Sequence, residues 1–152
     1  PINPNAFNQH AAYLAAMAKL GRELELIQVD GEGWNFEEVG FVEGRRLIAN
    51  GRLRTNTPLC SNDRLVKGMM SAAFEANLRV GHATGCELWV AGHDDHPFSR
   101  YTCPAFTIVS RDYAAIGRCS VDTIMKIIDS NEKSVNREVK LFERRLILRG
   151  SA

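Results

Sequence analysis

Apolar positions along the chain follow two periods, one typical of helices and one typical of strands. Four apolar residues near the amino terminus have helical spacing: Tyr13, Leu14, Met17 and Leu20. Gly21 is a plausible end for that helix, and the run 24–30 predicts a strand. Asn35 and Glu38 then have the spacing of a capping box, which predicts a second helix that ends before Gly51.

The rest of the chain continues this alternation. Runs 58–63, 86–92 and 106–110 predict three strands. The helix after the first of them has an apolar face made of Leu65, Val66, Met69, Met70, Ala73 and Phe74. Asp112 caps the helix after the third, whose apolar stripe is Ile116, Val121, Ile124, Ile127 and Ile128. The closing run EVKLFERRLILRG predicts strands at a sheet edge, and the whole order predicts an α/β fold with three layers around a parallel sheet.

Composition places the chain among globular proteins and removes several function classes. Its 152 residues suffice for one domain, and 45% of them are hydrophobic. The net charge of +1 and the lack of a basic run do not favour nucleic acid as a direct partner. No apolar run is long enough to span a bilayer, so we expect no membrane association. Four cysteines without CxxC spacing suit reduced thiols and a cytoplasmic location.

Polar residues stand where two of the predicted strands end, which indicates a ligand site. In open parallel sheets, ligands bind beyond the carboxyl ends of the strands. Asn62 ends one strand and Asp94 ends another, so we expect both at the same edge of the sheet. A carboxylate and a carboxamide suit ligands rich in hydroxyl groups. An aromatic face for such a ligand is available from Trp34, Phe36 or Tyr113.

The stretch AGHDDHPFSRY raises a metal site and an acid–base site as alternatives. His93 and His96 are three positions apart, but no nearby residue completes a set of zinc ligands. Asp94 and Asp95 have no evident nucleophile or base partner. The GEG at 31–33 lacks the third glycine of a dinucleotide-binding loop. We therefore expect no metal, no cofactor and no enzymatic activity.

Three segments together resemble a known family. They are NDRLVKGMMSAAFEANLRVG, LWVAGHDDHPFSRYTCPAFTIVSRDYAAIGRCSVDTIMKII and RRLILRGS. Their order and spacing are similar to the carboxyl-terminal half of LacI-type transcriptional regulators. That family typically shows Asn-Asp at a strand end, then an Asp-Asp strand end, a Gln-Asp before a helix, and a closing Leu-x-x-Arg-x-Ser. The similarity runs from about Phe7 to Ser151.

The resemblance implies the later part of a two-lobed sensor shaped like a periplasmic sugar-binding protein. Residues 1–106 and 138–152 would form the second lobe, and 107–137 would cross to a first lobe that is largely missing here. The first strand of the second lobe and the helix-turn-helix domain would also lie outside this chain. Operator DNA would be bound only through that missing domain. The regulator would be a homodimer, with its contact near the helix 64–77 and Tyr101.

The resemblance also implies a set of effector contacts. The matching positions are Asn62, Asp94, Trp34 or Asn35, Arg111 with Asp112 and Tyr113, and Gln9. In that family the residue matching Asp94 typically binds ligand hydroxyl groups. Gln9 replaces a usual arginine, and Arg111 replaces a usual glutamine. The expected effector is a sugar or a related hydroxylated metabolite, with an acidic one paired to Arg111 as an alternative.

Three functions remain open from the sequence. They are the sensor of a transcriptional regulator, a periplasmic-type solute-binding protein, and an α/β enzyme. A regulator requires an upstream helix-turn-helix, a solute-binding protein requires an export signal, and an enzyme requires a catalytic set that the sequence does not show. With the first lobe missing, we further expect the apolar stripe within 107–129 to lose its cover and the chain to self-associate.

Overall fold

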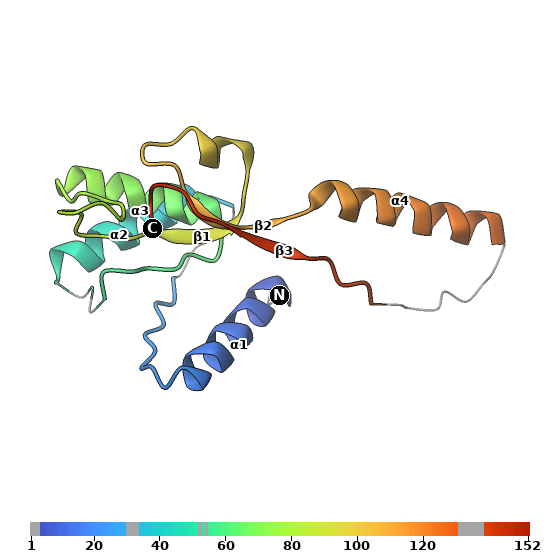
Figure 1. Ribbon diagram of the computed structural model, residues 1–152, viewed down its shortest axis with the longest axis horizontal. Coiled ribbons are helices and arrows are strands. Elements are labelled where there is room, and N and C mark those ends of the chain that lie inside the picture. The colour runs from blue at the N-terminus through green and yellow to red at the C-terminus, as the bar shows by residue number, and fades with distance from the viewer. Residues whose placement is uncertain (1–3, 30–33, 52, 54, 131–138) are drawn as a thin grey trace.

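The computed structural model describes residues 4–29, 34–51, 53, 55–130 and 139–152. Their order is α1 (Pro4–Lys19), α2 (Phe36–Ala49), α3 (Asp63–Glu75), β1 (Ala91–Asp94), a 3-10 helix η1 (Pro97–Arg100), β2 (Thr107–Arg111), α4 (Tyr113–Ser130) and β3 (Arg144–Ile147). Figure 1 shows α2 and α3 packed beside the strands, with α1 set apart below them and α4 projecting to one side. The GEG segment at 31–33 lies outside the described residues.

The described sheet has three strands in the order β1-β2-β3. β1 and β2 are parallel, with Asp94 opposite Ser110, whereas β2 and β3 are antiparallel, with Arg111 opposite Arg144. The α/β class is confirmed, and the closing strand does lie at an edge. The sheet is mixed rather than wholly parallel, because α4, which connects β2 to β3, projects away from the sheet instead of crossing its face, and β3 returns antiparallel beside β2.

Three predicted strands differ from the structure. Of the run 86–92, only Ala91 and Gly92 belong to β1, and Leu88 makes a single bridge with Val80. The two earlier strands are reduced because they have too few neighbours. Residues 24–29 belong to no helix or strand, and Asp30 is not described. The run 58–63 contributes only a single bridge, from Leu59 to Ala91. A cavity of about 830 Å³ is lined by α1, by the segment 22–29 and by residues 57–61. A strand exists only when it is paired, so the space between these segments explains both departures.

The core lies between α3 and the sheet. It consists of Val66, Met69, Ala73, Leu88, Val90, Phe106 and Ile108. Behind it, α2 and α3 approach each other closely at Gly68, where an added Cβ would lie 2.1 Å from the Glu37 carbonyl oxygen. Gly51 ends α2 with a φ of +59°, as the sequence predicted. The cap itself differs, since the Asn35 side chain contacts Glu38 and makes no hydrogen bond to the helix backbone.

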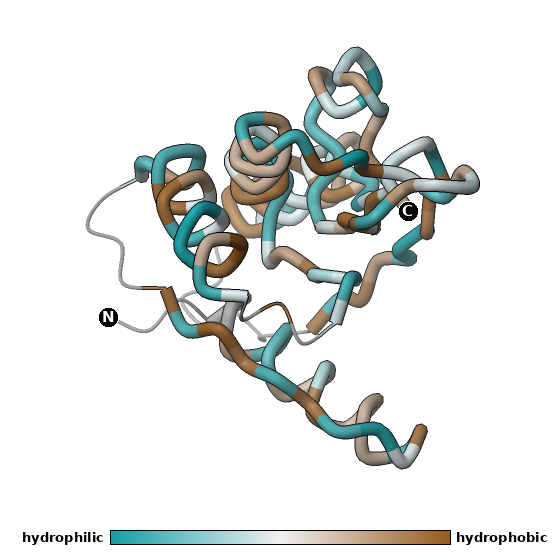
Figure 2. Tube along the Cα trace, turned by 90° about the vertical axis from the view of Figure 1, so that its left-hand side faces the viewer, coloured by the Kyte–Doolittle hydropathy of each residue, from teal (hydrophilic) through white to brown (hydrophobic). Residues whose placement is uncertain are grey.

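α4 lies outside this core. None of its residues is buried. Figure 2 shows the hydropathy of each residue along the chain. Four apolar side chains of α4 are exposed, which we call the α4 stripe: Val121, Ile124, Met125 and Ile128. Ile116 and Ile127 are half-buried. The stripe therefore has no cover in the described part of the chain, as expected from the sequence.

Candidate functional site

Three of the predicted site residues meet at the carboxyl ends of β1 and β2. Asp94 ends β1, Arg111 ends β2, and Tyr113 begins α4 two residues later. The Asp94 Oδ1 atom lies 3.1 Å from Arg111 Nη2 and accepts a hydrogen bond of 3.2 Å from the Tyr113 hydroxyl. Partial burial, together with the Asp94 carboxylate, raises the pKa of Tyr113, so the phenol stays a hydrogen-bond donor well above neutral pH. The parallel register of the two strands brings these groups together.

Asn62 lies at the same edge of the sheet, but its side-chain oxygen already has a structural partner. Its Oδ1 atom accepts a 2.8 Å hydrogen bond from the Leu65 backbone N–H and so caps α3. Its amide NH₂ is left to donate to a ligand. An added Cβ at Gly92 would lie 3.3 Å from the Asn62 carbonyl oxygen, so β1 runs directly beside this turn.

Asp63 fixes the loop that follows β1. It is buried, and its Oδ2 atom accepts hydrogen bonds from the His96 backbone N–H at 2.7 Å and from the Ser99 hydroxyl at 3.3 Å. Burial raises the pKa of Asp63, and the nearby Asp94 carboxylate raises it further. The Asn-Asp strand end and the Asp-Asp strand end are therefore close enough to interact electrostatically.

The remaining predicted residues lie apart from this group. Trp34 and Asn35 are exposed at the start of α2, and Trp34 packs its edge on Phe36 at 5.9 Å between ring centroids. Gln9, on α1, lines the 830 Å³ cavity together with His93. Within the described residues, no hydrogen bond or ion pair joins Trp34, Asn35 or Gln9 to Asp94. Asp112 caps α4 by accepting a 2.8 Å hydrogen bond from the Ala115 N–H.

The two histidines occupy different environments. His93 is half-buried, its Nδ1 atom is buried without a hydrogen-bond partner, and burial lowers its pKa. His96 is exposed, and its ring lies 4.8 Å from that of Phe98. In the described ranges, no three His, Cys, Asp or Glu side chains are grouped as metal ligands. The absence of a metal stays a prediction for the whole chain.

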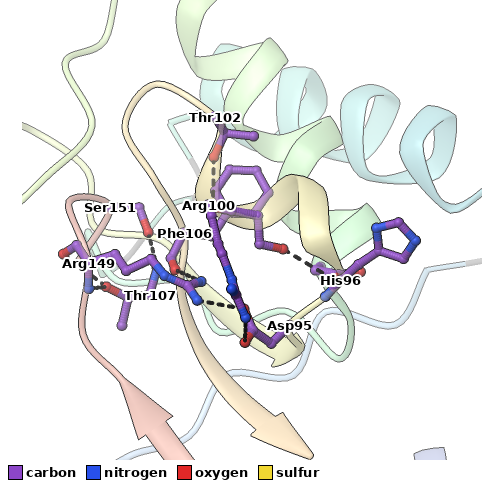
Figure 3. Close-up of polar contacts among 10 residues, drawn as sticks. Asp95, His96, Arg100, Thr102, Phe106, Thr107, Arg149 and Ser151 are labelled. Carbon is purple, nitrogen blue, oxygen red and sulfur yellow. Dashed lines mark hydrogen bonds and ion pairs between the residues drawn. The ribbon is translucent and has the colours of Figure 1, made fainter. Parts of the chain in front are cut away.

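The structure adds one anchor that the sequence reading missed. Asp95 turns away from the site and pairs with Arg149, 2.7 Å from its Oδ1 atom (Figure 3). Ser151 donates a 2.6 Å hydrogen bond to the Val90 carbonyl. The signal was the closing Arg-x-Ser of the family resemblance, to which no role had been given.

Comparisons with known proteins identify the family of the chain. A model of the periplasmic binding protein-like domain matches residues 6–152. The HTH-type transcriptional repressor PurR of Erwinia tasmaniensis is 30% identical over 148 residues, which cover 93% of this chain and 41% of that protein. The lactose operon repressor of Escherichia coli strain K12 is 29% identical over 111 residues, which cover 72% of this chain and 29% of that protein. This chain thus spans less than half the length of these relatives.

A solved structure shows the same fold. The lac repressor dimer bound to operator and the anti-inducer ONPF superposes with a TM-score of 0.77 at 23% identity. The superposition covers 97% of this chain and 48% of that one. No helix among the described residues is both long and apolar enough to cross a membrane.

Proposed function

Because this chain belongs to the periplasmic binding protein-like domain family, we propose that it is the effector-sensing part of a LacI-type transcriptional regulator. The observation that carries the proposal is similarity to transcriptional repressors over 93% of the chain in the PurR relative. Those relatives are repressors and not enzymes. A periplasmic-type solute-binding protein shares the same kind of domain, but the similar curated proteins named above do not support that alternative.

The course of the chain supports the proposed division into lobes. Residues 1–106 and 138–152 would form the second lobe, with 107–137 crossing to a first lobe outside this chain. In support, the chain leaves the sheet at β2, forms α4 away from the core, and returns at β3 beside β2. An excursion whose two ends pair with each other is the arrangement that two crossing strands between lobes require.

The effector site we propose is centred on Asp94. Its carboxylate already pairs with Arg111 and accepts a hydrogen bond from the Tyr113 hydroxyl. This triad lies at the strand ends, where the Asn62 amide has no acceptor among the described residues. Trp34, Asn35 and Gln9 would complete the site only from the surrounding segments. Because Asp94 offsets the charge of Arg111, a carboxylate ligand would have to displace it. A hydroxylated ligand can instead bond to both partners, so we favour a neutral sugar-like effector.

The complete regulator would be a cytoplasmic homodimer that binds operator DNA through a helix-turn-helix domain outside this chain. In support of a dimer contact near α3, Phe74 is 85% exposed and Tyr101 is 86% exposed. Large aromatic side chains with such exposure are typical of interfaces. No cofactor is part of the proposal.

Two experiments test this function. The complete gene should encode a helix-turn-helix before this chain, whereas an export signal would favour the solute-binding alternative. Calorimetric titration of the complete protein with D-ribose, D-glucose and D-glucuronate then tests the effector class. Glucose and glucuronate differ only at C6, so tighter binding of glucuronate would show that Arg111 accepts an acid and would contradict the preference for a neutral ligand.

A further inference from the structure

The turn that carries Asp94 has an unusual backbone. Asp94 has a φ of +97° and Asp95 a φ of +61°, so two consecutive residues with side chains lie in the left-handed region. Aspartate tolerates this region better than most residues, but it still costs free energy relative to an ordinary strand end. Such a conformation persists only where the surroundings hold it. Something outside the turn must therefore stabilise it.

The Asp95 side chain supplies the connection. Its carboxylate is only 4% exposed, and its Oδ1 atom lies 2.7 Å from Arg149 Nη2. Arg100 is a second cation near Asp95, but its Nη2 atom is 3.7 Å from Oδ2 and its side chain is 62% exposed. A buried, short, charge-assisted pair is stronger than an exposed, long one. Arg149 is thus the main partner of Asp95.

Arg149 is itself held on several sides. Its Nη1 atom donates a 2.9 Å hydrogen bond to the Phe106 carbonyl, and its backbone N–H donates one of 2.9 Å to Thr107 Oγ1. Ser151, two residues later, accepts a 2.8 Å hydrogen bond from the Thr107 backbone N–H. Figure 3 shows these contacts around Asp95. The closing segment after β3 is therefore locked to the start of β2 and, through Asp95, to the end of β1.

We propose that Arg149 is a positioning residue for the effector site. By holding the Asp95 carboxylate inward, it fixes the left-handed turn and so directs the adjacent Asp94 carboxylate outward to Arg111 and Tyr113. Arg149 does not itself touch the effector. The proposal rests on the function proposed above, and it gives a role in that function to the segment that returns from the 107–137 excursion.

The hydroxyl of Tyr113 reports on the position of Asp94 without any ligand. Partial burial raises its pKa, the Asp94 and Asp63 carboxylates raise it further, and the Arg111 guanidinium opposes them in part. If Asp94 leaves its position in an Arg149→Met variant of this chain, the pKa of Tyr113 should fall toward its ordinary value. NMR of ring-labelled tyrosine, assigned with Tyr113→Phe, measures this shift over the range where circular dichroism shows a folded protein. An unchanged Tyr113 titration in Arg149→Met would overturn the proposal.

Two controls separate positioning from general stability. Arg100→Met makes the same substitution at the exposed partner of Asp95, and it should leave the Tyr113 titration unchanged. The double variant Asp95→Asn, Arg149→Met removes the unpaired buried carboxylate, so its melting temperature should recover while the Tyr113 shift remains. Recovery of both quantities would make Arg149 merely structural. If Arg149→Met does not fold, the double variant and Arg149→Lys take its place. A partial fall in the pKa of Tyr113 is expected for Arg149→Lys. An unchanged pKa of Tyr113 in both of these variants would again overturn the proposal.

The outcome is separable from that of the function proposed above. The Tyr113 measurement uses no effector, so a failure of the sugar titrations would leave it standing. Conversely, if the complete regulator with Arg149→Met binds its effector normally, the proposed function stands and only the positioning role of Arg149 is contradicted.

Discussion

At the scale of single residues, Asp94 is the side chain on which the proposed site depends. Replacing it with alanine in the complete regulator should remove effector response and leave the fold intact, because the neighbouring Asp95–Arg149 pair still holds the turn. Each charge-assisted bond lost to a ligand hydroxyl should cost about 1.5–3 kcal/mol, or roughly tenfold or more in affinity. Calorimetric titration measures this, and unchanged affinity would contradict the assignment. His96→Ala, at an exposed position in the same loop, is the control.

His93 should make stability depend on pH in one direction. Burial lowers its pKa below the ordinary value of 6.5, and Asp94 only partly opposes this. The folded protein therefore favours the neutral ring. The contribution of His93 to the free energy of unfolding is complete above about pH 6.5 and is lost as the pH falls through the lowered pKa. Between about pH 7.5 and about pH 5.5, the free energy of unfolding measured with urea should fall less for His93→Gln than for the parent chain. His96→Gln, on an exposed ring, should not reduce the loss.

The residue scale also shows where sequence reasoning stops. The proximity of Asp94, Arg111 and Tyr113 was predictable, because parallel strands bring their carboxyl ends to one edge. The cap that Asn62 makes is also a local contact, since its partner is the Leu65 N–H three residues later. The inward turn of Asp95 was not predictable, because it depends on a left-handed backbone and on Arg149, a distant partner that no local pattern encodes. Two adjacent aspartates look equivalent in the sequence, yet only one of them faces the site.

At the scale of elements, the contact between α2 and α3 is set by glycines. An added Cβ at Gly68 would lie 2.1 Å from the Glu37 carbonyl oxygen and 2.6 Å from the Phe41 nitrogen, and both are backbone atoms that cannot rotate away. Gly68→Ala should force the helices apart and destabilise the chain by about 1–3 kcal/mol or more. Chemical denaturation followed by circular dichroism measures the change.

Gly117 is the matched control for that substitution. It lies in α4, and an added Cβ would meet nothing within 4 Å. Gly117→Ala should therefore be neutral or stabilise by up to about 1 kcal/mol, since alanine favours helices. Equal effects of the two substitutions would mean that the α2–α3 contact is not tight.

Helices were more predictable than strands in this chain, for a physical reason. A helix satisfies its hydrogen bonds within one segment, so local spacing and Gly51 were enough to predict the extent of α2. A strand depends on its neighbours, and residues 24–29 pair with no other strand among the described residues. The antiparallel return of β3 was likewise invisible locally, because alternation predicts a strand but not its direction.

At the scale of the whole molecule, this chain should not bind operator DNA by itself. Its net charge is +1, so it offers little electrostatic attraction to phosphates. The recognition helix would belong to the complete regulator. A gel-shift assay with the chain alone should show no sequence-specific, salt-sensitive complex. Such a complex would contradict the proposed division of labour between this chain and the rest of the regulator.

The distribution of uncovered apolar surface predicts self-association. Burying one side chain of the α4 stripe is worth about 1.5–3 kcal/mol, so leaving four of them in water is a substantial cost for a chain of this size. Leu24, Leu26 and Leu59 are also exposed, on the extended segments that flank the 830 Å³ cavity. The backbone of 58–60 pairs with β1 through Pro58 and Cys60, which leaves the Leu59 N–H and C=O on its other edge. Open strand edges and an open helix face both favour a second chain.

Sedimentation velocity at low micromolar concentration should therefore show dimers or larger species. Ile124→Lys with Ile128→Lys should weaken the association if the α4 stripe is the main contact, whereas Asp122→Lys, an exposed polar position on the same helix, should not. Association that persists in the double variant would point to the strand edges beside the cavity, where chains could add to one another's sheets. A cooperative monomer in the parent chain would mean that neither surface needs cover, and the expectation that 107–137 packs on a first lobe would lose its energetic basis.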